Sequence, residues 1–159
     1  MTQSKSKTTA TTKPQEATAL LRADHKLVDS LFAQYESTKS VTKKKALVAQ
    51  ICQELTVHAQ IEEEIFYPQV QDALNDHELV PEAVVEHATL KDLIAQIEDA
   101  EPDGEMYDAK VKVLSEYVKH HVKEEQNEIF PKVRKTELDL KAIGEELAER
   151  KEELLGKLK

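Results

Sequence analysis

Apolar side chains recur every three or four residues in four segments of this chain, which is the spacing of one face of a helix. The first segment covers residues 18–37, and the second begins near residue 42 and runs towards Pro68. Their stripes are Leu21, His25, Val28 and Phe32, then Ile51, Leu55, His58, Glu62 and Ile65. Each pattern predicts an amphipathic helix that carries ionisable side chains among its apolar positions.

Two further helices are predicted after Pro81 and from about residue 106. Their stripes are Val84, His87, Leu90, Ile94 and Ile97, then Leu114, Val118, His121, Glu125 and Ile129. Asp76 or Pro81 is expected to start the third helix, and Pro102 with Gly104 predicts a turn at residues 101–104. Because the connections are short, the fold class expected is all-α, an up-down-up-down four-helix bundle.

The ends of the chain differ from the bundle. Residues 1–17 are rich in Ser, Thr and Lys and are expected to form a flexible tail. Residues 18–135 form the expected bundle. Residues 136–159 contain an amphipathic stripe that predicts an additional C-terminal helix, either docked on the bundle or extending beyond it. Gly144 should weaken that helix by about 1 kcal/mol relative to Ala.

The second helix pair repeats the plan of the first. His58 and Glu62 are followed by Pro68, and His121 and Glu125 are followed by Pro131 at the same spacing. Each proline is expected to end or kink its helix, with another turn after Pro68. Asp24-His25 and Glu86-His87 stand 33 and 34 residues before the second His of each pair. The chain therefore reads as a duplicated helix pair, and each copy contributes two His and one Glu.

Composition narrows the class of protein. A third of the 159 residues are charged, Gly is scarce and Trp is absent, as expected of one all-helical domain. The net charge of −9 argues against a nucleic-acid partner. Cys52 is the only cysteine, so no intramolecular disulfide or thiolate cluster is expected. No apolar run approaches the ~20 residues of a membrane span, and no secretory signal is recognised, so a cytoplasmic protein without membrane contact is predicted.

Buried carboxylates are the strongest indication of function. An unpaired buried carboxylate costs several kcal/mol, and no Lys or Arg occupies the stripes of the first, second and fourth helices. Imidazole with carboxylate suits iron, zinc or manganese, so a metal pair is predicted, and the alternative is a hydrogen-bonded polar network. A single His–Glu spacing of four is uninformative, and His120 with Glu124 is taken as incidental. The Glu-x-x-His spacing of ferritin-like bundles is absent.

These motifs closely resemble the hemerythrin-like HHE cation-binding family, over residues 18–135. The resemblance implies two non-haem iron ions, which an oxo group can bridge. It implies that Glu62 and Glu125 bridge the two irons. The terminal ligands, each bound to a single iron, would be His25, His58, His87 and His121. Oxygen-carrying hemerythrins have a further His where this chain has Lys91, so a more open site and no reversible oxygen carriage are expected. Glu63, Lys91, Tyr117 and Glu124 are candidates to lie around the ligands.

Two functions follow from an open di-iron site. The first is binding or scavenging of small oxidants (dioxygen, peroxide or nitric oxide) in oxidative or nitrosative stress, with catalase-like peroxide disproportionation as the enzymatic option. The alternative is a non-enzymatic iron- or oxygen-sensing module, whose metal loading a partner protein reads. Iron storage is a weaker third option, because a two-metal bundle has little capacity.

Overall fold

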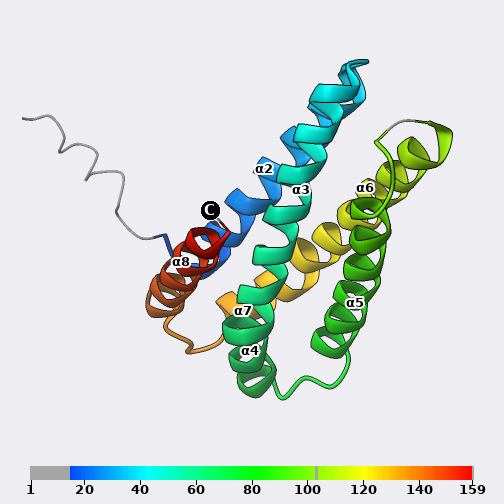
Figure 1. Ribbon diagram of the computed structural model, residues 1–159. Coiled ribbons are helices and arrows are strands. Elements are labelled where there is room, and N and C mark those ends of the chain that lie inside the picture. The colour runs from blue at the N-terminus through cyan, green and yellow to red at the C-terminus, as the bar shows by residue number, and fades with distance from the viewer. Residues whose placement is uncertain (1–14, 103, 159) are drawn as a thin grey trace, which may run out of the picture.

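The structure is a computed structural model that describes residues 15–102 and 104–158, so residue 103 of the predicted turn and most of the predicted tail lie outside the described residues. Four long helices form an up-down-up-down bundle, as predicted (Figure 1). They are α2 (Ala17–Ser37), α3 (Val41–Ile61), α5 (Leu79–Glu98) and α6 (Glu105–Glu124). In the described residues, every helix is too short or too polar to cross a membrane.

Short polar residues begin or end these helices. The Ser40 side chain accepts a hydrogen bond from the backbone N–H of Lys43 and starts α3. Asp76 accepts from the N–H groups at the start of α5, which confirms its expected capping role. Gly104 has a φ of 99° before α6, a conformation that favours glycine, as the predicted turn required.

The helices do not end at the two prolines. A π-turn occupies η1 (Glu62–Phe66) and another occupies η2 (Glu125–Ile129), and α4 (Tyr67–Leu74) and α7 (Phe130–Arg134) continue from them. Pro68 and Pro131 lie in the first turn of α4 and α7, where their missing N–H removes one α-helical hydrogen bond. The local shift to hydrogen bonds between residues five apart accommodates that loss. The expectation of a helix end is therefore corrected, whereas continuation beyond Pro68 is confirmed.

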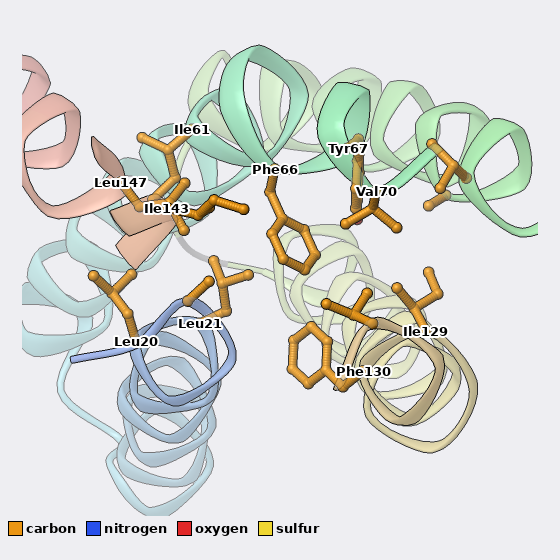
Figure 2. Close-up of a cluster of buried hydrophobic side chains, with 14 of the residues drawn as sticks. Leu20, Leu21, Ile61, Phe66, Tyr67, Val70, Ile129, Phe130, Ile143 and Leu147 are labelled. Atoms are coloured by element: carbon orange, nitrogen blue, oxygen red, sulfur yellow. The ribbon is translucent and has the colours of Figure 1, made fainter. Parts of the chain in front are cut away.

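Two apolar clusters fill the bundle, one towards each end. The first includes Leu20, Leu21, Ile61, Phe66, Ile129, Phe130 and Leu147, and Figure 2 shows how they converge. The second includes Val28, Phe32, Ile51, Cys52, Leu90, Leu114 and Val118. On each long helix the boundary between the clusters falls at the His of the stripe. The ionisable side chains are thus held in one layer between two apolar layers.

The C-terminal helix docks on the bundle. Helix α8 (Leu140–Lys157) lies beside the start of α2 and the end of α3 (Figure 1). Ile143 and Leu147 are buried in the first apolar cluster, next to Leu20 and Ile61 in Figure 2. Docking, rather than extension beyond the bundle, is therefore the correct one of the two options for this helix.

Gly144 lies where α8 crosses the chain just before α2, and replacing it with Ala is expected to destabilise the protein. A Cβ at this position would lie 2.0 Å from the carbonyl oxygen of Gln15 and 2.9 Å from the carbonyl carbon of Glu16. The clash is with backbone atoms, which cannot move aside easily. Helix propensity alone would predict that alanine stabilises this helix, and the clash reverses the sign of that stability change. We expect Gly144→Ala to lower the free energy of unfolding by about 1–3 kcal/mol, measured by urea denaturation.

Gly156, in the same helix, supplies the matched control. A Cβ there meets no atom within 4 Å, so Gly156→Ala should keep or raise stability by up to about 1 kcal/mol. Equal effects of the two substitutions would contradict the close packing of α8 on the start of α2.

Candidate metal centre

Six ionisable side chains from the four long helices and their π-turns meet in the layer between the apolar clusters. They are His25, His58, Glu62, His87, His121 and Glu125, the residues expected from the stripes. All six are buried, and Glu62 and Glu125 are fully buried. Each Glu is the first residue of a π-turn, one helical turn after the His of the same stripe. The structure therefore brings together every residue predicted as a ligand.

The donor atoms form two groups that share Glu62. His25, His58, Glu62 and Glu125 each offer an atom within 4.8 Å of the others, and so do Glu62, His87 and His121. Glu62 Oε1 lies 3.4 Å from His58 Nε2 in the first group and 3.2 Å from His87 Nε2 in the second. A carboxylate between two pairs of imidazoles is the arrangement in which one side chain can contact two cations.

Four buried atoms in this cluster make no hydrogen bond to any described residue. They are His25 Nε2, His58 Nε2, Glu62 Oε2 and Glu125 Oε1. His25 Nε2 and Glu125 Oε1 are 3.1 Å apart, yet neither forms a hydrogen bond because the geometry is unsuitable. Buried polar atoms are normally paired, and these are imidazole nitrogens and carboxylate oxygens, both of which are metal donors. The donor set fits a bound cation.

The outward-facing nitrogens of three imidazoles are hydrogen-bonded to carboxylates. His58 Nδ1 lies 2.8 Å from Asp24, His87 Nδ1 lies 2.7 Å from Glu63, and His121 Nδ1 lies 2.6 Å from Glu86. A carboxylate on Nδ1 fixes the tautomer that presents Nε2 as a free lone pair, which is the usual support of metal-binding His. On the fourth imidazole, His25 Nδ1 lies 3.3 Å from the side-chain amide of Gln126.

Tyr67 places a phenol inside the cluster. Its hydroxyl donates to Glu125 Oε2 at 2.5 Å and lies 3.1 Å from Glu62 Oε1. It also lies 3.4 Å from Nε2 of both His87 and His121. Burial and the two carboxylates raise the pKa of Tyr67 well above its usual value, so its proton stays on the oxygen at neutral pH.

Comparison with known proteins agrees with this geometry. The model of the Hemerythrin HHE cation binding domain family matches residues 16–133, which span all four long helices and both π-turns. The chain belongs to the hemerythrin HHE cation-binding family. A crystal structure of a hemerythrin HHE cation-binding domain-containing protein from Mycobacterium kansasii has the same fold. Its TM-score is 0.77 at 23% identity, and the match covers 90% of this chain and 89% of that one.

A relative from Nostoc sp., named a DNA nickase, is 30% identical over 115 residues. The match covers 72% of this chain and only 32% of the relative's length. The part shared with that protein is therefore no larger than the HHE domain, which in this chain extends over residues 16–133.

The charge of this HHE site favours cations. Five carboxylates belong to or contact the cluster: Asp24, Glu62, Glu63, Glu86 and Glu125. Lys91 bonds Glu63 and Lys151 bonds Asp24, which leaves an excess of three negative charges when the imidazoles are neutral. Burial opposes ionisation of Glu62, but attraction to His58 and hydrogen bonds from His58 and His87 hold its pKa well below the usual value. Burial opposes protonation of His58 and His121, but the neighbouring carboxylates raise the pKa of His58 well above its usual value and that of His121 to about 8. Without a metal ion the cluster therefore holds protons on its imidazoles, and a bound cation would take their place beside the carboxylates.

Of the four candidates expected around the ligands, Glu63 contacts a proposed ligand directly and Lys91 is connected to it only through Glu63. Glu63 bonds His87, and Lys91 bonds Glu63 from the next turn of α5. Tyr117 lies one turn before His121 but is 49% exposed, so the expectation that it lies beside the ligands is corrected. Glu124 lies 3.6 Å from the exposed His120, also outside the cluster.

Four contacting residues had no role in the sequence prediction. Asp24 and Glu86 stood in the recognised motifs, next to a His, but their hydrogen-bond partners are on other helices. Tyr67 stands immediately before Pro68 of the repeated His-Glu-Pro plan, and no pattern in the sequence pointed to Gln126. For Asp24 and Glu86, an acidic residue before the first His of each pair was the available signal.

Proposed function

We propose that this chain is a non-haem di-iron protein that reacts with small oxidants such as hydrogen peroxide, dioxygen and nitric oxide. The observation that supports it is the set of four inward imidazole nitrogens around two buried carboxylates, with four atoms left without hydrogen-bond partners. His25 and His58 would hold one iron, His87 and His121 the other, and Glu62 and Glu125 would bridge them. An iron pair supplies reversible one- and two-electron chemistry to such a site.

The protein's own residues supply a proton and apolar walls. Tyr67 keeps a proton within hydrogen-bond distance of both bridging carboxylates, where a reacting oxygen would need one. Phe130 stacks on His25 with ring centroids 6.1 Å apart and Phe66 packs on Phe130, so two fully buried rings shield this side of the cluster. Lys91 stands where oxygen-carrying relatives have a further His, and it bonds Glu63 instead of reaching the cluster. The resulting four-imidazole site suits turnover of oxidants better than oxygen carriage.

The experiment is metal analysis followed by peroxide turnover. We expect two irons per chain, the visible absorption of an oxo-bridged ferric pair, and evolution of one O2 for every two H2O2 consumed. The reaction should stop when iron is removed. Full iron occupancy without any reaction towards peroxide or nitric oxide would refute the proposal.

A second candidate function, sensing of iron or oxygen, is favoured by one contact. Lys151 of α8 bonds Asp24, and Asp24 bonds His58, so the C-terminal helix is two hydrogen bonds from a proposed ligand. A change at His58 on metal loading would reach α8, whose outer face a partner protein could read. Metal-dependent hydrogen exchange in α8, without turnover, would favour sensing over catalysis.

We do not extend the DNA nicking named for the Nostoc relative to this chain. The match covers 32% of that relative, and the present chain carries a net charge of −9, which repels a phosphate backbone.

A further inference from the structure

A groove of about 320 Å³ runs between α2 and α6 and ends at the proposed metal centre. His25 lines it with a side chain that is 7% exposed, and Gln126, whose amide contacts His25 Nδ1, lies beside it. Phe32 and Val118 form apolar walls. A groove of this size holds about ten water molecules, so it admits small molecules to the His25 side of the cluster.

The mouth of this groove is positively charged although the protein is acidic. Its lining includes Arg22 and Lys26 of α2 and Lys119 and Lys123 of α6, against one carboxylate, Asp29. The two cations on each helix are four residues apart, so they lie on one face of that helix and both line the groove. None of the four cations forms an ion pair with any residue in the described part of the chain.

Several basic side chains elsewhere in the chain form ion pairs, unlike the four at the groove. Lys44, Lys91, Arg150 and Lys151 are each bonded to a carboxylate within the protein. Arg22 lies over the Phe130 ring, 5.8 Å from its centroid, and this contact leaves its charge unneutralised. With a net charge of −9 overall, the field of the protein repels anions except where such a cluster reverses it locally.

We propose that the α2–α6 groove captures small inorganic anions and guides them to the His25 side of the buried cluster. This rests on the proposed di-iron function and adds to it the class of ligand, because neutral dioxygen, peroxide and nitric oxide gain nothing from the charged mouth. Anions of two or three heavy atoms, such as azide, nitrite or superoxide, fit the groove. Charge focusing of this kind raises association rates by about 10- to 1,000-fold and is weakened by salt.

The test compares a groove variant with a matched control in the iron-loaded protein, using azide as the anionic probe. Lys26→Gln/Lys119→Gln/Lys123→Gln removes three charges at the groove, and Lys39→Gln/Lys43→Gln/Lys45→Gln removes three exposed charges elsewhere. Arg22 is kept because it packs on Phe130. At low ionic strength we expect azide association to slow about tenfold in the groove variant and less than twofold in the control.

Salt and charge give two further readouts. Raising the salt to about 0.3 M should slow azide association in the wild-type chain to the rate of the groove variant. Nitric oxide, which is neutral, should bind all three chains at the same rate. Equal azide rates in the groove and control variants would overturn the proposal, because the effect would then belong to net charge alone.

A metal-free arm separates this inference from the proposed function. Azide titrated into the metal-free, ¹⁵N-labelled protein should shift amide signals of residues 22–29 and 118–127, and these shifts should vanish in the groove variant. Absence of shifts overturns the groove even if the protein binds two irons and consumes peroxide. Shifts in a protein that binds no iron support the groove and refute the di-iron function. A short single-stranded DNA that shifts the same signals more strongly than azide overturns the assignment to small anions.

Discussion

Replacing Glu62 with alanine is expected to abolish binding of both metal ions, not one. Glu62 is the residue common to the two donor groups, and its Oε1 lies 3.4 Å from His58 Nε2 and 3.2 Å from His87 Nε2. Its removal takes an anionic ligand from each metal ion. The imidazoles would then have to hold two cations close together with one carboxylate fewer to offset their repulsion. Loss of an outer partner commonly lowers metal affinity 10- to 100-fold, so loss of this shared ligand should exceed about 100-fold.

Metal content per chain after dialysis measures the effect, and Glu64→Ala is the matched control. Glu64 lies two residues further along the same π-turn, but it is 40% exposed and bonds Arg150. We expect Glu64→Ala to keep both metal ions and Glu62→Ala to keep none. A Glu62→Ala chain that retained one tightly bound metal ion would show that the two groups bind independently, and the bridging role would have to be abandoned.

The bundle and its six central residues were predictable because helical periodicity is a local property. An apolar stripe with a His at each midpoint specifies which face is buried, and four such helices have only one common interior. His25 illustrates this, since its neighbours in the stripe, Leu21 and Val28, are buried in opposite apolar clusters. The location of the centre between those clusters follows from the same stripes.

Tyr67 could not be placed by periodicity, because the π-turn changes the rotation of the helix. In a regular α-helix, a residue five positions after Glu62 points about 140° away from it. In the structure, the N–H of Tyr67 bonds the carbonyl of Glu62, so the fifth residue lies over the first and its hydroxyl reaches the cluster. The second copy has Phe130 five residues after Glu125, with the same π-turn hydrogen bond. At this equivalent position, the first copy therefore has the phenol of Tyr67 and the second has the phenyl ring of Phe130.

Each carboxylate of the two acid-His motifs orients an imidazole on a different helix. Asp24 precedes His25 but bonds His58, and Glu86 precedes His87 but bonds His121. In each copy, the acid beside the first His supports the second His, 34 or 35 residues away. Adjacent residues on a helix point about 100° apart, so an acid beside a His faces the neighbouring helix and not its own neighbour. The motif was visible, but its partner depended on helix packing.

Removing the metal is expected to lower the melting temperature by about 10 °C. Wild-type protein holds two carboxylates, Glu62 and Glu125, at zero exposure, and the cluster with its contacting acids has more negative than positive groups. A cation whose free concentration is about a thousandfold above its Kd adds about 4 kcal/mol to the free energy of unfolding. For a chain of this size, each 1 kcal/mol shifts the melting temperature by about 2–4 °C. Scanning calorimetry with and without a chelator measures the shift.

The Glu62→Ala chain is the control for this measurement, since the chelator should leave its melting temperature unchanged. Identical melting of loaded and stripped wild-type protein would mean that the buried cluster is satisfied by its own protons and hydrogen bonds, as a polar network. The result also separates the two proposed functions when peroxide turnover is measured on the same samples. A large shift with turnover supports oxidant chemistry, whereas a large shift without it leaves metal-dependent stability, relayed through Asp24 and Lys151 to α8, as the property that a sensor uses.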